Sequence, residues 1–255
     1  MNKIVFIGAG NLATRLSIEM KKDGFEILQV YSHTELSAQT LSHQLGCSYT
    51  TALSEIRTDA DLYIFSVKDA VLDQMIAQIP TNNGLWVHTA GSMPMEIFGN
   101  YHDRYGIIYP LQTFTKQKVV DFSVIPFFIE CNSQQDLQAL QLVAQRITNK
   151  VIVADSEQRK YIHLAAVFAC NFANHMFDIA ATLMKEHGLP FEALLPLIEE
   201  TALKVKKISP HNAQTGPAIR YDKNVMNRHI GLLKDERLKQ LYQLISQNIH
   251  DYSNK

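Results

Sequence analysis

The stretch Lys3–Ala13, KIVFIGAGNLA, decides the fold of this chain. Its apolar half predicts a buried parallel strand, its glycines predict a tight turn, and a helical pattern follows. In a dinucleotide-binding turn, Gly8 permits the bend and Gly10 lets the backbone approach a pyrophosphate at the positive end of the helix. We therefore expect dinucleotide binding here, with Asn11 and Leu12 on the phosphates. The alternative is a plain strand-turn-helix that needs glycine for steric reasons alone.

Length and composition favour a cytoplasmic, two-domain protein. The 255 residues exceed the usual ~100 to 200 of one domain. A net charge of -1 gives no electrostatic reason to expect nucleic acid or an anionic membrane as partner. The three cysteines lie far apart and fit neither a disulfide framework nor a zinc site, so we expect no metal. The first strand begins at residue 3 and no apolar run approaches ~20 residues, so we expect neither a signal peptide nor a membrane span.

Strand and helix patterns alternate up to Val153, which predicts an α/β domain, a doubly wound Rossmann-type parallel sheet, over residues 1–153. Strand patterns then stop, and residues 154–255 are predicted to form an all-helical domain for substrate binding and dimerisation. After the first strand we expect strands at 26–31, 62–67, 85–89, 106–109, 127–130 and 150–153. In the second domain we expect Asp155 or Ser156 to cap a long helix that runs to about Glu186, and we expect further helices at 192–207 and 235–248.

The ends of the predicted strands indicate how a cofactor would be held. Ligands of such sheets bind beyond the carboxyl ends of the strands, and NAD sites usually place an acid at the second of them. This chain has Ser32 and His33 there, so we favour NADP over NAD; a solvated loop that selects neither is the alternative. Val67 and Ala90 would line the nicotinamide side. The same edge offers two candidate substrate contacts, Ser92 and Gln112.

The long helix carries a polar stripe. At 100° per residue, six positions fall within an arc of roughly 80°: Lys160, His163, Val167, Asn171, Asn174 and Asp178. Because most other faces are apolar, this stripe should face partners or a wet cleft. We expect His163 to act as general acid or base, Asn171 to orient the substrate, Lys160 to add a charge or pass a proton, and Asn174 to contact substrate. The alternative is a solvent-facing stripe or internal hydrogen bonding between the domains.

A second polar segment, Gln214–Asp222, contains a Thr-Gly-Pro turn followed by Arg220. Arg220 is a candidate to bind a substrate carboxylate. A structural pair with Asp222 is the alternative, and dimer contacts would explain the nearby His229.

Five motifs together carry a family resemblance: Gly8–Ala13, Ala90–Ser92, Pro110–Phe114, Tyr161–Asn171 and Thr215–Arg220. Over nearly its whole length the chain resembles a poorly characterised family in which a Rossmann-like domain precedes a helical domain of unknown function. Its wider relatives are pyrroline-5-carboxylate reductase and the β-hydroxyacid dehydrogenases. Their second domain resembles the C-terminal part of 6-phosphogluconate dehydrogenase and commonly builds a dimer. The resemblance therefore implies an oxidoreductase that forms a homodimer through its helical domain.

The resemblance transfers only some residues. In the β-hydroxyacid dehydrogenases a lysine and an asparagine one helical turn apart act on the substrate, and Asn171 with Lys160 or His163 is the nearest match. His163 and Asn171 lie about two turns apart, so the lysine role does not transfer. The chain also departs from the close family at Tyr109, where histidine is usual, and at Tyr221, where glycine is usual.

These observations lead to one functional hypothesis. We expect an NADP-dependent oxidoreductase that transfers hydride between the nicotinamide and a small carbonyl, hydroxy or imino compound. One alternative is a non-catalytic dinucleotide-binding sensor or scaffold. Another is an enzyme with a different hydride carrier, such as a deazaflavin.

Overall fold

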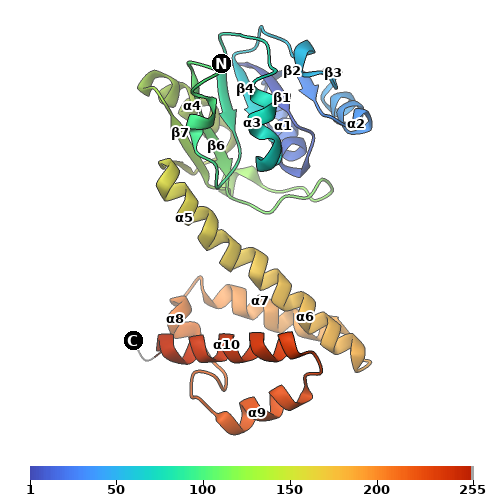
Figure 1. Ribbon diagram of the computed structural model, residues 1–255, viewed down its shortest axis with the longest axis vertical. Helices are drawn as coiled ribbons and strands as arrows, with labels where there is room; N and C mark the ends of the chain where they lie inside the picture. Colours follow the sequence, from blue (N-terminus) through green and yellow to red (C-terminus); the bar gives the residue numbers. More distant parts are fainter. Residues whose placement is uncertain (254–255) are drawn as a thin grey trace. The chain divides into compact units, whose positions relative to one another are not determined.

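A computed structural model describes residues 1–253 (Figure 1). Its sheet has eight strands in the order β3-β2-β1-β4-β5-β6-β7-β8, and every neighbouring pair is parallel except β6 and β7. The first six follow the Rossmann order, which confirms the predicted α/β class. The strands are β1 (Lys3–Ile7), β2 (Glu26–Tyr31), β3 (Ser48–Thr50), β4 (Leu62–Phe65), β5 (Leu85–His88), β6 (Tyr105–Pro110), β7 (Phe127–Cys131) and β8 (Val151–Val153).

Both faces of the sheet are covered. Along β1, Ile4 and Phe6 belong to one buried cluster and Val5 and Ile7 to another, because successive side chains of a strand point to opposite faces. The first cluster includes residues of three helices, α1 (Asn11–Lys22), α2 (Glu35–Leu45) and α4 (Gln134–Ile147). The second includes residues of α3 (Asp69–Ile76). Burial on both faces explains why β1 is apolar throughout rather than alternating.

Two features of the sheet differ from the prediction, one an additional strand and the other a strand direction. Strand β3 was not expected; it has only three residues, of which two are exposed, so its apolar pattern is weak. Strand β7 runs antiparallel to β6 because the segment between them contains only a short 3-10 turn, Phe122–Val124. A parallel neighbour would need a longer crossover, usually through a helix.

The long helix runs from Ser156 to Glu186, as expected, but it is not uniform. Asp155 and Gln158 form a capping box at its start. Between α5 (Ser156–Ala166) and α6 (Ala173–Glu186), the segment Val167–Phe172 is a π-helix. Each π turn holds about one extra residue, so His163 and Asn171 lie about 20° apart around the axis instead of ~80°.

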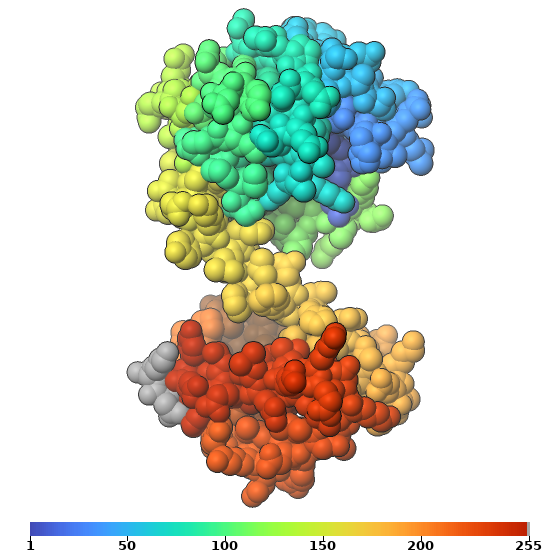
Figure 2. All heavy atoms as spheres, in the orientation of Figure 1, coloured from blue at the N-terminus to red at the C-terminus, as the bar shows by residue number. Residues whose placement is uncertain are grey.

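Contacts divide the chain into two units, Met1–His175 and Met176–Lys255. The boundary expected at 153/154 coincides with the end of the last strand. The boundary between the two contact units lies farther on, within the long helix, because the first half of this helix contacts the sheet domain. In its described part, the second unit (orange to red in Figure 2) consists of helices joined by turns and loops, with no strand. Its further helices are α7 (Leu195–Lys204), α8 (Pro210–Ala213), α9 (Lys223–Leu232) and α10 (Glu236–Ser253).

Candidate functional site

The turn after β1 contains the two glycines of the predicted dinucleotide site. Gly8 has a φ of 123°, and a Cβ there would lie 2.2 Å from the carbonyl oxygen of Ser66, so the fold itself requires glycine. Gly10 is different. Its φ of -75° suits any residue, and no protein atom lies within 4 Å of a Cβ built on it. The fold therefore does not explain the glycine at position 10, whereas close approach of a ligand to the backbone does.

A cavity of about 800 Å³ opens beside this turn at the carboxyl ends of the strands. It brings together seven of the eight predicted cofactor residues: Gly8, Gly10, Asn11, Leu12, Ser32, His33 and Val67. Ala90 is not among the residues that line it, although the preceding Thr89 is. Two lysines that were not predicted as site residues also line the cavity, Lys68 before α3 and Lys116 from the segment between β6 and β7. No strand pattern or motif marked Lys116, because a loop position reveals its neighbours only after folding.

The end of β2 carries hydroxyl and imidazole groups. The amide of Thr34 donates to Ser32 Oγ at 3.3 Å, and Thr34 Oγ1 lies 3.1 Å from His33 Nε2. None of the cavity-lining residues, all of which belong to the described part of the chain, is acidic. The cavity is therefore lined by cationic and hydroxyl side chains that would attract a bound anion, and none of its described lining residues has a carboxylate that would repel one.

The predicted acid or base, His163, forms a pair with Tyr109. Nδ1 of His163 lies 3.0 Å from the hydroxyl of Tyr109, which stands near the end of β6. Burial raises the pKa of Tyr109, so its hydroxyl stays protonated at neutral pH. Gly91 lies against both rings, since a Cβ there would be 2.5 Å from His163 Nδ1 and 2.9 Å from Tyr109 Cζ. The sequence marks Tyr109 as a departure from a family pattern and places it at a carboxyl strand end, but it was not predicted as a site residue.

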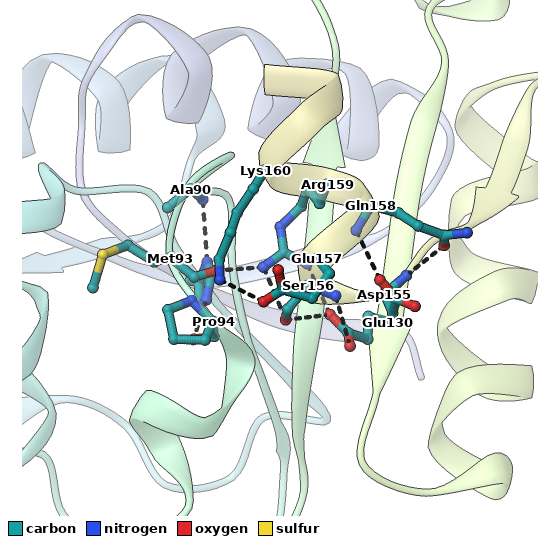
Figure 3. A network of polar contacts seen from close by, with 11 residues as sticks. Ala90, Met93, Pro94, Glu130, Asp155, Ser156, Glu157, Gln158, Arg159 and Lys160 are labelled. Carbon is teal, nitrogen blue, oxygen red and sulfur yellow. Dashed lines mark hydrogen bonds and ion pairs between the residues drawn. The ribbon is translucent and has the colours of Figure 1, made fainter. Parts of the chain in front are cut away.

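A polar network holds the loop that contains Gly91 (Figure 3). The buried His88 accepts from the amide of Ala90 at 3.2 Å and faces the carbonyl of Pro94, also at 3.2 Å. Arg159, which is fully buried on α5, donates to Glu130 Oε2 at 2.8 Å and to the carbonyl of Met93. Ala90 thus belongs to a structured loop beside His163.

The other predicted site residues have these positions. Lys160 is exposed and paired with Glu157 at 2.6 Å, and Ser92 donates to Asp69 at 2.8 Å. Gln112 is exposed and accepts from the amide of Thr113 at 2.8 Å.

The candidates farther along the chain are all exposed. Asn171 lies in the π segment and Asn174 on α6. Arg220 belongs to the second unit, where Asp222 caps α9 by accepting from the amide of Val225 at 3.1 Å instead of pairing with Arg220. Among the residues described, no group of three or more His, Cys, Asp or Glu side chains could hold a metal ion.

Two family models match the chain. Residues 3–87 match the family described as NADP oxidoreductase coenzyme F420-dependent, and residues 125–249 match a domain of unknown function, DUF2520. No curated protein matches the sequence significantly.

Several solved structures match over nearly the whole chain. A protein from Bacteroides fragilis named putative NADP oxidoreductase is 49% identical, with 98% of each chain covered and a TM-score of 0.92. A 1-pyrroline-5-carboxylate reductase from Streptococcus pyogenes is 15% identical, covers 98% of this chain and 97% of its own, and has a TM-score of 0.66. An imine reductase from Myxococcus stipitatus, solved with NADP+, is 13% identical and has a TM-score of 0.65; the match covers 99% of this chain and 93% of the reductase. These last two show the fold alone.

Proposed function

Because the chain belongs to the same family of NADP oxidoreductases as the Bacteroides fragilis protein, we propose that it transfers hydride between NADP(H) and a small carbonyl, hydroxy or imino compound. The observation that carries the proposal is Gly10, a glycine that the fold does not need and that opens into the cavity. A bound pyrophosphate would use that space, with Asn11 and Leu12 at the helix N-terminus beside it. The nicotinamide would supply the hydride chemistry when bound.

The charge of the cavity favours NADP over NAD. An NAD site usually holds the ribose 2′-hydroxyl with an acid, and no acid lines this cavity among the described residues. Ser32, His33 and Thr34 would donate to a 2′-phosphate. Lys68 and Lys116 add positive charge to the same cavity. The matched family description also names coenzyme F420, which makes this deazaflavin the second candidate carrier.

His163 is the residue that we propose to exchange a proton with the substrate. When the protonated hydroxyl of Tyr109 donates to Nδ1, the neutral imidazole carries its own proton on Nε2. Nε2 would then be the proton-transfer atom, and Asn171 would orient the substrate on the same helix face. Lys160 contributes less, because its charge is balanced by Glu157.

Calorimetry on cofactor-stripped protein tests the proposal. We expect NADPH to bind more tightly than NADH, and Gly10→Asp to abolish binding because a carboxylate would occupy the space for the phosphates. Gly231→Asp is the matched control, since Gly231 also has open space around its Cβ position but lies on α9 of the second unit. Binding of neither nicotinamide cofactor would overturn the proposal, and binding of F420 alone would replace the carrier.

We further propose that a second copy of the chain covers the helical unit. None of the residues of α6, α7, α8 and α9 is buried. Leu197 on α7, Leu232 on α9 and Leu244 on α10 are even 65%, 75% and 70% exposed. A unit of this size needs a larger buried core to be stable alone. Leu244→Glu should therefore weaken the dimer in sedimentation equilibrium, whereas Leu142→Glu, an exposed leucine on α4, should not. An unchanged dimer, or a monomeric native protein, would contradict this.

We propose a cytoplasmic location. Helix Ser156–Glu186 is long and apolar enough, by length and composition, to cross a membrane. It also carries His163, Asn171 and Asn174 in its central part, and polar groups at such positions are costly in lipid. Fractionation of cells into soluble and membrane material would test the location.

A further inference from the structure

The side chain of Arg159 connects three parts of the first unit (Figure 3). It projects from α5 one turn before His163 and is 0% exposed. Nη1 donates to Glu130 Oε2 on β7 at 2.8 Å, and Nη2 donates to the carbonyl of Met93. Glu130 is itself held by the amide and hydroxyl of Ser156, at 3.1 and 2.8 Å. One guanidinium thus links helix, strand and loop.

The loop that Arg159 contacts is fixed at both of its ends. Burial lowers the pKa of His88 to about 4, so its ring is neutral at pH 7. Since Nδ1 accepts from the amide of Ala90, Nε2 carries the proton and donates to the carbonyl of Pro94. His88 therefore closes the loop from Ala90 to Pro94, and Arg159 holds its Met93 end against the helix.

The middle of this loop contacts the proposed acid or base. Gly91 is buried, and the space that a Cβ would fill there is taken by the ring of His163 and by Tyr109. The position of the imidazole thus depends on where the loop backbone lies. Arg159 and His163 are four residues apart on the same helix, so a shift of the Met93 end relative to α5 changes the fit between Gly91 and the ring.

The chemistry of the Arg159 contacts is better suited to fixing geometry than to stability. A buried ion pair is often no more stable than apolar side chains of the same size, because both charges lose their hydration. The Nε–H of Arg159 is also buried without a partner. A planar guanidinium, however, donates in fixed directions, which an apolar side chain cannot do.

We propose that Arg159 is a positioning residue, which holds the Ala90–Pro94 loop and β7 against α5 and thereby fixes the ring of His163 between Gly91 and Tyr109. Only the effect on turnover rests on the proposed function; the effect on the ring does not.

Nitrogen-15 NMR of the imidazoles in the full chain tests this without a substrate. In the charge-balanced double variant Arg159→Met with Glu130→Met, we expect the His163 ring signals to shift and the population of its Nε2–H tautomer to fall. Arg159→Lys keeps the charge but loses the fork, and it should move the same signals in the same direction. This single variant decides the matter if the double variant does not fold.

The matched control is Arg104→Met with Asp136→Met, which removes another Arg-carboxylate pair, 2.6 Å apart, from the sheet domain. It should lower stability and leave the His163 signals in place. Native His163 signals in a folded Arg159 variant would overturn the inference, whereas failure of the native protein to bind NADPH would overturn only the proposed function. Once a substrate is identified, kcat should fall roughly 10- to 100-fold in Arg159→Lys, with the Kd for NADPH unchanged.

Discussion

The hydroxyl of Tyr109 and Nδ1 of His163 lie 3.0 Å apart, although 54 residues separate them in the sequence. If this hydrogen bond sets the tautomer of His163, Tyr109→Phe should lower kcat roughly 10-fold or more and change its pH dependence, because the imidazole loses its fixed donor. NADPH affinity should not change, since neither ring lines the cofactor cavity. Tyr109→His, which restores a hydrogen-bonding side chain, should recover part of the rate. Equal pH profiles for native protein and Tyr109→Phe would contradict this role.

The two glycines of the first turn should separate folding from binding. In Gly8→Ala a methyl group would meet the carbonyl of Ser66 at a φ of 123°, so we expect the free energy of unfolding to fall by roughly 3 kcal/mol or more. Gly10→Ala has open space and an ordinary φ, so its unfolding free energy should stay within about 1 kcal/mol of the native value. NADPH binding should nevertheless weaken at least roughly 10-fold. Urea unfolding and calorimetry would measure both, and a Gly10→Ala protein with native affinity would remove the reason for assigning the site.

The sequence was sufficient for those parts of the fold that depend on local pattern. The apolar run Ile4–Ile7, the turn at Gly8 and the capping signal at Asp155 are each contained in a few neighbouring residues, and the structure confirms them. Strand β3 was missed because an exposed edge strand needs little apolar patterning. The π segment was missed because helical periodicity counts every residue as one α-helical step.

The candidate site was harder to predict because its parts come from distant segments. His163 was marked by its place on a polar stripe, but Tyr109 and Gly91 reach it only through the order of the strands. Lys116 joins the cavity from a loop with no periodic pattern. Composition and spacing indicate which side chains have useful chemistry, whereas tertiary contacts decide which of them meet.

Tyr221 has a φ of 51°, in the left-handed region that favours glycine. Its ring stacks on that of His250 with 4.3 Å between the ring centroids, and its hydroxyl donates to Gln247 Oε1 at 2.9 Å. Tyr221→Gly and Tyr221→Ala both lose these contacts, but only alanine keeps the strained backbone. Tyr221→Gly should therefore be more stable than Tyr221→Ala by about 1 kcal/mol.

At an ordinary helical position alanine should be more stable than glycine, which is the reverse of the order at position 221 and provides the control. On α7, Ala202→Gly should lower the unfolding free energy by about 1 kcal/mol. Thermal or urea unfolding of the three variants and the native protein would measure both differences. Alanine more stable than glycine at position 221 would mean that the backbone there is not strained.

His88 should make the sheet domain less stable in mild acid. Its pKa is lowered to about 4, chiefly by burial; Arg159 lowers it further, while the hydrogen bond to Pro94 and the charge of Asp69 raise it. In the unfolded chain His88 has an ordinary pKa near 6.5. At pH values between about 4 and 6.5 the unfolded state therefore binds a proton at His88 and the native state does not. Stability from the neutral ring is present above pH 6.5 and is lost as pH falls toward 4. From pH 7 to pH 5 the loss should be about 2 kcal/mol.

Urea unfolding of native protein and His88→Gln at pH 7 and pH 5 would measure this loss. Glutamine does not titrate and can both donate and accept, so its stability should fall by about 2 kcal/mol less over the same interval. The half-buried His102, whose pKa burial also lowers, contributes in the same sense to both proteins and cancels in the comparison. Carboxylates with a lowered pKa, such as Asp136, stay ionised between pH 7 and pH 5 and therefore contribute little to the loss of stability in this interval. Equal losses in the two proteins would mean that His88 accepts its proton without breaking the loop, which would contradict a fixed, neutral ring.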